Sequence, residues 1–259
     1  MQSTCQNIVG KLTETDQETA ASSSYAYWLA GIICPEILQP SCRERMATRE
    51  VRRHLVGAGG DFHEARDVIL ASIEFRRSWQ VNLLRTLSMT DTSALNLTSE
   101  QLKLREEYRE LVREDLAKQP MVVRGSDKDN RAIFIKYGRR EKDTTEKAYT
   151  LAQLYVAERA LAVTELQSLG QREDILAIFD FGTYSSSKAP PFPIVRGGTR
   201  QLQVLYAERM VRLYVLDPPI WMSVFYNLLY PFIASKARSK VKMVGSGKKH
   251  AIFEEMIAP

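Results

Sequence analysis

The chain has 259 residues, 44% of them hydrophobic and 26% charged, which is an ordinary globular composition and argues against wholesale disorder. Its formal net charge of +5 favours anionic surfaces but falls short of the dense basic stripe of a dedicated DNA-binding protein. Its three cysteines, Cys5, Cys34 and Cys42, include no Cys-x-x-Cys pair, so we expect neither a disulfide framework nor a zinc site.

The first part of the chain is predicted to be helical. Residues 1–24 are polar, rich in Ser and Thr, and predicted to form a flexible tail. No apolar stretch follows a basic region there, so we expect no signal peptide and a cytoplasmic protein. Residues 25–118 are expected to form a helical subdomain, in which a glycine-rich turn at 57–60 separates two helices. Asp61 can cap the second of these, and a charged helix is expected at 99–118.

Residues 119–259 have the texture of alternating strands and helices. Strands are expected at 132–137, 175–179, 211–216 and 241–244. Helices are expected at 144–169, 199–206 and 220–232, with a Pro/Gly-rich connection at 190–198. Strands separated by helices indicate a largely parallel sheet with crossover helices. The predicted fold class is therefore α/β, with a mostly parallel sheet preceded by a small all-helical subdomain.

Two apolar runs, 25–38 and 219–233, are shorter than the roughly 20 residues needed to cross a bilayer. They belong in a core, a pocket or a membrane interface. In the second run, five apolar residues share one wide helical face: Trp221, Phe225, Leu228, Leu229 and Phe232. Taken alone, such a face is most often part of an ordinary core.

A basic run follows, with six Lys or Arg residues and no acid between residues 236 and 249. These residues are Lys236, Arg238, Lys240, Lys242, Lys248 and Lys249. The run is either a solvated strand edge or a surface that attracts anionic headgroups. A nucleic-acid site is disfavoured, because no aromatic residue interleaves with the run to stack on bases.

Enzyme signatures are incomplete. Residues 180–182 spell Asp-Phe-Gly, but the glycine-rich loop, strand lysine and His-Arg-Asp loop of a kinase are missing from the sequence. Residues 245–248 spell Gly-Ser-Gly-Lys, which is part of a phosphate loop. Lys242 stands where that loop has its first glycine, and Lys249 stands where it ends in Ser or Thr. Glu158 and Glu165 fall on the apolar stripe of a helix and are interpreted as structural acids paired with arginine. We therefore expect no catalytic residue, no metal and no cofactor.

The segment from Tyr206 to Val241 resembles the signature of CRAL-TRIO lipid-binding domains. It has Tyr-x-Glu-Arg at 206–209, a strand followed by two prolines at 218–219, an apolar helix, Tyr-Pro-Phe at 230–232 and Ser-Lys-Val at 239–241. The likeness extends over roughly residues 45 to 250, because Asp180 and the helical region up to Trp79 also match.

The resemblance, which is to the class of phosphatidylinositol/phosphatidylcholine transfer proteins, implies that the chain binds one lipid, a phospholipid such as a phosphoinositide, and exchanges it with membranes. It implies a headgroup site at Glu208, Arg209 and Lys240. The helix 220–232 would be a gate over an apolar pocket, with Trp221, Phe225, Leu228, Leu229 and Phe232 on its inner face. Lys236, Arg238 and Lys242 would contact an anionic membrane transiently, and the protein would be a monomer that does not bind nucleic acid.

The chain also departs from the family pattern. Ala207 replaces the usual proline, and residues 56–60 replace a basic stretch that helps to hold an inositol phosphate in a phosphatidylinositol-transfer member of the family. Ala237 stands where that member has a phosphate-binding Thr. These differences leave the identity of the lipid open. The alternative function is a lipid-gated interaction or regulatory module without transfer activity.

Overall fold

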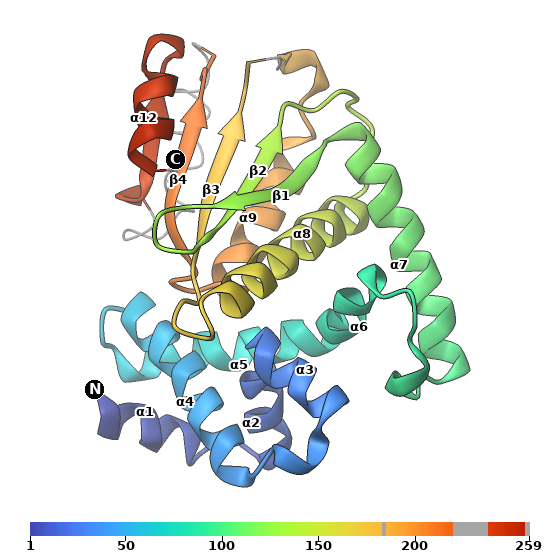
Figure 1. The fold of residues 1–259 in the computed structure, drawn as a ribbon, viewed down its shortest axis with the longest axis vertical. Coiled ribbons are helices and arrows are strands. Elements are labelled where there is room, and N and C mark those ends of the chain that lie inside the picture. Colours follow the sequence, from blue (N-terminus) through green and yellow to red (C-terminus); the bar gives the residue numbers. More distant parts are fainter. Residues whose placement is uncertain (183–184, 220–237, 257–259) are drawn as a thin grey trace. The chain divides into compact units, whose positions relative to one another are not determined.

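The computed structural model describes residues 1–182, 185–219 and 238–256, shown in colour in Figure 1. The chain divides into two compact units. A helical unit contains Met1–Glu106 together with Val204–Arg209, and a sheet unit contains Glu107–Gln203 together with Met210–Pro259.

The helical unit is built from successive helices joined by short turns. They are α1 (Gln2–Val9), α2 (Glu14–Ala21), α3 (Tyr25–Ile33), α4 (Pro40–Gly57), α5 (Phe62–Ser78), α6 (Val81–Arg85) and the first part of α7 (Ser99–Lys118). Three short 3-10 helices lie among them, at Pro35–Ile37, Thr86–Ser88 and Ser93–Leu95. The predicted cap is confirmed, since the Asp61 carboxylate accepts a hydrogen bond of 2.8 Å from the backbone amide of Glu64.

The prediction of a flexible tail over residues 1–24 is wrong, because these residues form α1 and α2. Cys5, Ile8, Val9 and Leu12 are buried and pack in one core with apolar residues of α4 and α5. Their spacing of i, i+3, i+4 and i+7 is that of a helical face, although Ser, Thr and Gln surround them. Thr13 then caps α2 by accepting a 3.1 Å hydrogen bond from the amide of Asp16.

In the described part of the sheet unit, five strands form one sheet in the spatial order β1-β2-β3-β4-β5. They are β1 (Met121–Ser126), β2 (Ala132–Tyr137), β3 (Ile175–Asp180), β4 (Met210–Leu216) and β5 (Val241–Val244). β1 runs antiparallel to β2, and the other neighbours are parallel. The four predicted strands and the mostly parallel sheet are confirmed. β1 was not predicted, because Arg124 and Gly125 interrupt the apolar residues of this edge strand.

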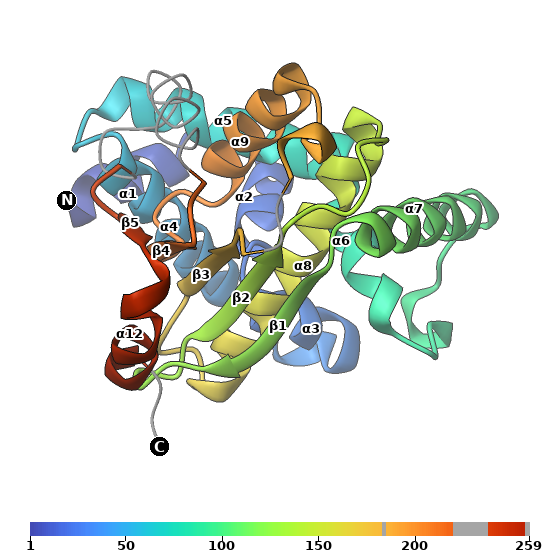
Figure 2. The same cartoon turned by 90° about the horizontal axis from the view of Figure 1, so that it is seen from above.

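Among the described residues, the helices of the sheet unit are the part of α7 from Glu107 on, α8 (Glu146–Gln167), α9 (Phe192–Leu205, of which Val204 and Leu205 belong to the helical unit) and α12 (Lys249–Met256). Short 3-10 turns lie at Ser186–Lys188 and Ser246–Lys248. The predicted start of α9 at residue 199 is wrong. The helix begins at Phe192 because Pro193 lies in its first turn, where a missing amide hydrogen costs nothing. Figure 2 shows α8 running along the sheet, where it packs on β1 and β2.

Successive side chains of a strand point to opposite faces, so the register assigns each residue to one of two faces. One face packs against Ile252 and Met256 of α12 and is called the α12 face. The other, which contacts α8 through Ala132 and Lys136, is called the α8 face. One row of register partners crosses the α8 face from β2 to β5: Lys136, Phe179, Val215 and Met243.

Candidate functional site

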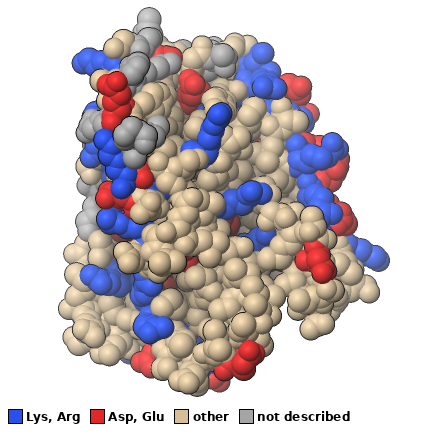
Figure 3. Space-filling view, viewed as in Figure 1, with Lys and Arg blue, Asp and Glu red and all other residues tan. Residues whose placement is uncertain are grey.

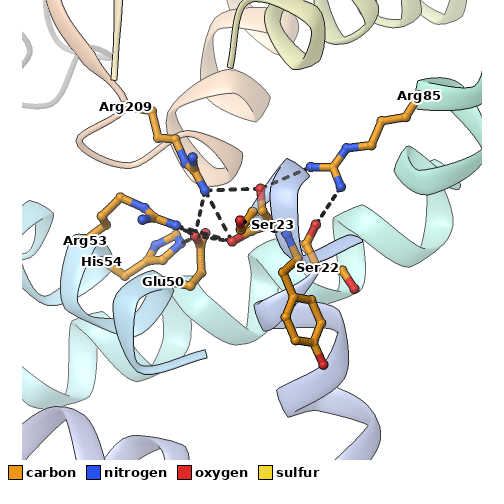
Figure 4. Close-up of polar contacts among 9 residues, drawn as sticks. Ser22, Ser23, Glu50, Arg53, His54, Arg85 and Arg209 are labelled. Atoms are coloured by element: carbon orange, nitrogen blue, oxygen red, sulfur yellow. Dashed lines mark hydrogen bonds and ion pairs between the residues drawn. The ribbon is translucent and has the colours of Figure 1, made fainter. Parts of the chain in front are cut away.

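Arg209 lies in a buried polar network of the helical unit (Figure 4). Its Nη2 atom donates to a carboxylate oxygen of Glu50 at 3.3 Å, and to the carbonyl and hydroxyl oxygens of Ser23 at 3.2 and 3.3 Å. Arg53 and His54 of α4 also contact the Glu50 carboxylate, the latter through Nε2 at 3.2 Å. Because Arg209 is only 1% exposed, solvent does not compete for these contacts.

Arg85 extends the network to the end of α2. Its Nη1 and Nη2 atoms donate to the carbonyl oxygens of Ser22 and Ser23 at 2.6 and 3.1 Å. The last carbonyls of a helix have no partner within the helix and carry partial negative charge. Arg85 and Arg209 therefore hold the chain where it leaves α2.

The electrostatics of the network keep Glu50 ionised. Burial alone would raise the pKa of the Glu50 carboxyl, but Arg53, a hydrogen bond from His54 and Arg209 together hold it well below its ordinary range. The carboxylate is therefore available to both arginines at neutral pH.

The network fixes the turn that leads into β4. The Arg209 amide donates to the Tyr206 carbonyl at 3.0 Å, and Glu208 between them has a φ of 57°, a left-handed conformation that is uncommon for glutamate. A Cβ on Gly57 would lie 3.8 Å from the Ala207 Cβ, so two positions that depart from the family pattern are neighbours. In the structure Arg209 has a positioning role within the helical unit, and its contact with a headgroup stays a prediction.

The other predicted cationic residues lie in the sheet unit. Arg238 and Lys240 precede β5 and are half-buried, and the Lys240 carbonyl accepts a 2.9 Å hydrogen bond from the Leu213 amide. Lys242 is exposed on β5, with its Nζ atom 5.8 Å from the centroid of the Tyr214 ring. Lys236 lies outside the described residues. The network around Arg209 and the cations at β5 thus belong to different units.

The residues of the predicted gate also lie outside the described part of the chain. These are Trp221, Phe225, Leu228, Leu229 and Phe232. The helix expected at 220–232 and its role as a gate stay predictions.

The α8 face contains a buried lysine, Lys136, which was not among the predicted site residues. Lys136 Nζ donates to the Tyr149 hydroxyl at 3.1 Å and to Gln153 Oε1 at 3.2 Å, both on α8. It also lies 4.8 Å from the centroid of the Tyr149 ring and 5.4 Å from that of Phe179. The available signal was a lysine within the otherwise apolar run Ala132 to Tyr137, where a strand covered on both faces should be continuously apolar.

Two acids in the later turns of α8 are buried. Glu158 and Glu165 are each 2% exposed, and their pairing with arginine stays a prediction. Within the described residues, no group of three or more His, Cys, Asp or Glu side chains is placed to hold a metal ion. None of the described helices has both the length and the apolar character that crossing a membrane requires.

Comparisons with known proteins agree with the α/β architecture. A family model of the CRAL/TRIO domain matches residues 116–259. The phosphatidylinositol transfer protein PDR17 of Saccharomyces cerevisiae is 27% identical over 141 residues, which are 52% of this chain and 36% of that protein. The match thus spans about a third of the yeast protein's length.

A solved structure shares the fold. The crystal structure of Sfh5 matches with a TM-score of 0.56 and 11% sequence identity, covering 81% of this chain and 70% of the Sfh5 chain. This coverage is larger than the family match over 116–259, so the likeness in fold includes part of the helical unit.

Proposed function

This chain belongs to the CRAL/TRIO domain family, and on that premise we propose that it binds a single lipid in its sheet unit and exchanges it with membranes. The family match over residues 116–259 carries the proposal, because this range contains the whole sheet and α8. The proposed role involves no chemical reaction. The protein would be cytoplasmic, monomeric and only transiently bound to membranes.

The α8 face of the sheet supports this proposal. In the row that crosses it, Phe179 is half-buried, Val215 is buried and Met243 is 42% exposed. With strands about 4.8 Å apart, the apolar part of the row, from Phe179 to Met243, extends over about 10 Å. An apolar surface of this kind suits an acyl chain, because burial of apolar area is the main driving force for lipid binding.

The headgroup would lie near the entry to β5 at Lys240. Lys240 offers an ammonium group for a charge-assisted bond to phosphate. Within the helical unit, Arg209 would hold the turn at Glu208, since Glu50 and Ser23 already bind its guanidinium. Arg238, Lys242 and Lys236 would attract an anionic bilayer while the predicted gate at 220–232 exchanges the lipid.

Phosphatidylinositol is the first ligand to test, because a curated relative is named a phosphatidylinositol transfer protein. The assay follows movement of labelled phosphatidylinositol and phosphatidylcholine from donor to acceptor vesicles. We expect Lys240→Ala to lower phosphatidylinositol loading by about tenfold or more, the worth of a charge-assisted hydrogen bond.

Lys103→Ala is the matched control, because Lys103 is an exposed lysine on α7. Unchanged phosphatidylinositol loading of Lys240→Ala would contradict the headgroup site. Stoichiometric binding without transfer would instead identify the chain as a lipid-gated interaction module.

A further inference from the structure

The buried ammonium of Lys136 has no acidic partner among the described residues. Its polar contacts are the Tyr149 hydroxyl and Gln153 Oε1, and its aromatic neighbours are Tyr149 and Phe179. Lys136 is only 8% exposed, so water does not screen the charge. A buried cation without a counter-ion is costly, and natural proteins seldom keep one unless an anion or a dense set of acceptors compensates it.

Gln153 supplies a second donor at the same place. The ammonium group can only donate, so Gln153 must turn its Oε1 atom toward Lys136. Its Nε2 atom is then directed elsewhere, and it is buried without a hydrogen-bond partner in the described part of the chain. Few buried side-chain donors remain unpaired in folded proteins, so this atom calls for an acceptor.

Aromatic rings of the sheet and of α8, together with α9, lie beside these two donors. A Cβ on Gly198 would lie 3.1 Å from both Gln153 Nε2 and the Tyr149 ring, so α9 approaches the pair closely. On the sheet side, the Phe134 and Phe179 rings pack edge to face, with their centroids 6.3 Å apart. Beyond Phe179 the row continues with the apolar residues Val215 and Met243.

We propose that Lys136 Nζ and Gln153 Nε2 bind an anionic oxygen of the bound lipid, whose apolar part lies along the row from Phe179 to Met243. This inference rests on the proposed function and adds a chemical class of ligand to it. The two donors fit a phosphodiester or a carboxylate, since both present acceptor oxygens with negative charge. A neutral lipid such as diacylglycerol would leave the cation uncompensated.

The test loads the full chain from phosphatidylcholine vesicles that contain equal amounts of phosphatidylinositol, oleic acid and diacylglycerol. The protein is recovered, and its bound lipids are extracted and quantified by mass spectrometry. We expect the unmodified chain to carry phospholipid or oleic acid in preference to diacylglycerol. Whichever of the two is enriched identifies the oxygen as phosphate or carboxylate.

Two variants remove the site in different ways. Lys136→Met keeps the stem volume but removes the charge, and Gln153→Glu is nearly isosteric and supplies an internal counter-ion. Each should lower the ratio of bound phospholipid and oleic acid to bound diacylglycerol by about tenfold. This factor corresponds to the loss of one charge-assisted hydrogen bond. Lys142→Met removes an exposed lysine and should leave the ratio unchanged.

The outcomes separate this inference from the proposed function. If folded variants carry lipid with an unchanged ratio, the lysine site is wrong and lipid binding stands. Absence of any lipid on the unmodified chain would refute both. If Lys136→Met unfolds, Gln153→Glu decides, and unfolding of both variants would show that the cluster is purely structural.

Discussion

Glu50 illustrates how one buried carboxylate organises a turn far away in the sequence. Its partner Arg209 is 159 positions further along the chain, and Ser23 and Arg209 are 186 positions apart. A motif at 206–209 can identify Arg209 as a family position. Sequence alone does not reveal that α4 and the end of α2 supply its partners, because that depends on how the helices pack.

The network predicts a specific dependence of stability on pH. The folded-state pKa of Glu50 lies below its ordinary value, so its contribution to stability is complete above the ordinary pKa and is lost as the pH falls through the folded-state pKa. We expect Glu50→Gln to be destabilising at neutral pH, where breaking a buried pair costs about 3 to 5 kcal/mol.

Urea unfolding of the unmodified chain and Glu50→Gln at neutral and acidic pH tests this prediction. The difference between their free energies of unfolding should shrink in acid. A difference of the same size at both pH values would show that the carboxylate's charge is not what stabilises the network.

At the scale of elements, α1 and α2 are an integral part of the helical core. Ile8 has no exposed surface in the structure, and it packs with residues of α4 and α5. We expect Ile8→Ala to lower the free energy of unfolding by about 2 to 5 kcal/mol, as for other buried aliphatic residues.

Leu169→Ala is the control, because Leu169 is 88% exposed and its truncation should have little effect. Both variants are measured by chemical denaturation of the full chain. If Ile8→Ala and the unmodified chain had equal free energies of unfolding, residues 1–24 would not be part of the core, as in the original prediction of a tail.

The elements that could be predicted from the sequence are those with a strong local signal. The strands predicted at 132–137, 175–179 and 241–244 are mostly apolar runs, and Asp61 stands directly before a helical repeat. The N-terminal helices were missed because their apolar face is narrow and polar residues surround it. The early start of α9 was missed because prolines usually mark connections, although the first turn of a helix accepts them.

The same contrast applies to the candidate site. The resemblance at 206–241 indicates which positions matter in the family, but Lys136 lies outside that segment. Its importance follows from the register of β2 and from α8, which bring Tyr149 and Gln153 to its ammonium group.

At the scale of the whole molecule, basic and acidic residues nearly balance, with 36 Lys and Arg against 31 Asp and Glu. On the face shown in Figure 3, Lys and Arg side chains are interspersed with Asp and Glu, as expected for a formal net charge of only +5. Broad attraction to polyanions is therefore weak, and anion binding should depend on local sites such as Lys240 and Lys136.

The central claim is that the chain carries one lipid. Native mass spectrometry of the purified chain, after incubation with vesicles of phosphatidylcholine and phosphatidylinositol, tests it most directly. The account predicts a single added mass that equals one lipid per chain and that solvent extraction identifies as a phospholipid. A chain that stays folded and carries no lipid after every such loading would contradict it.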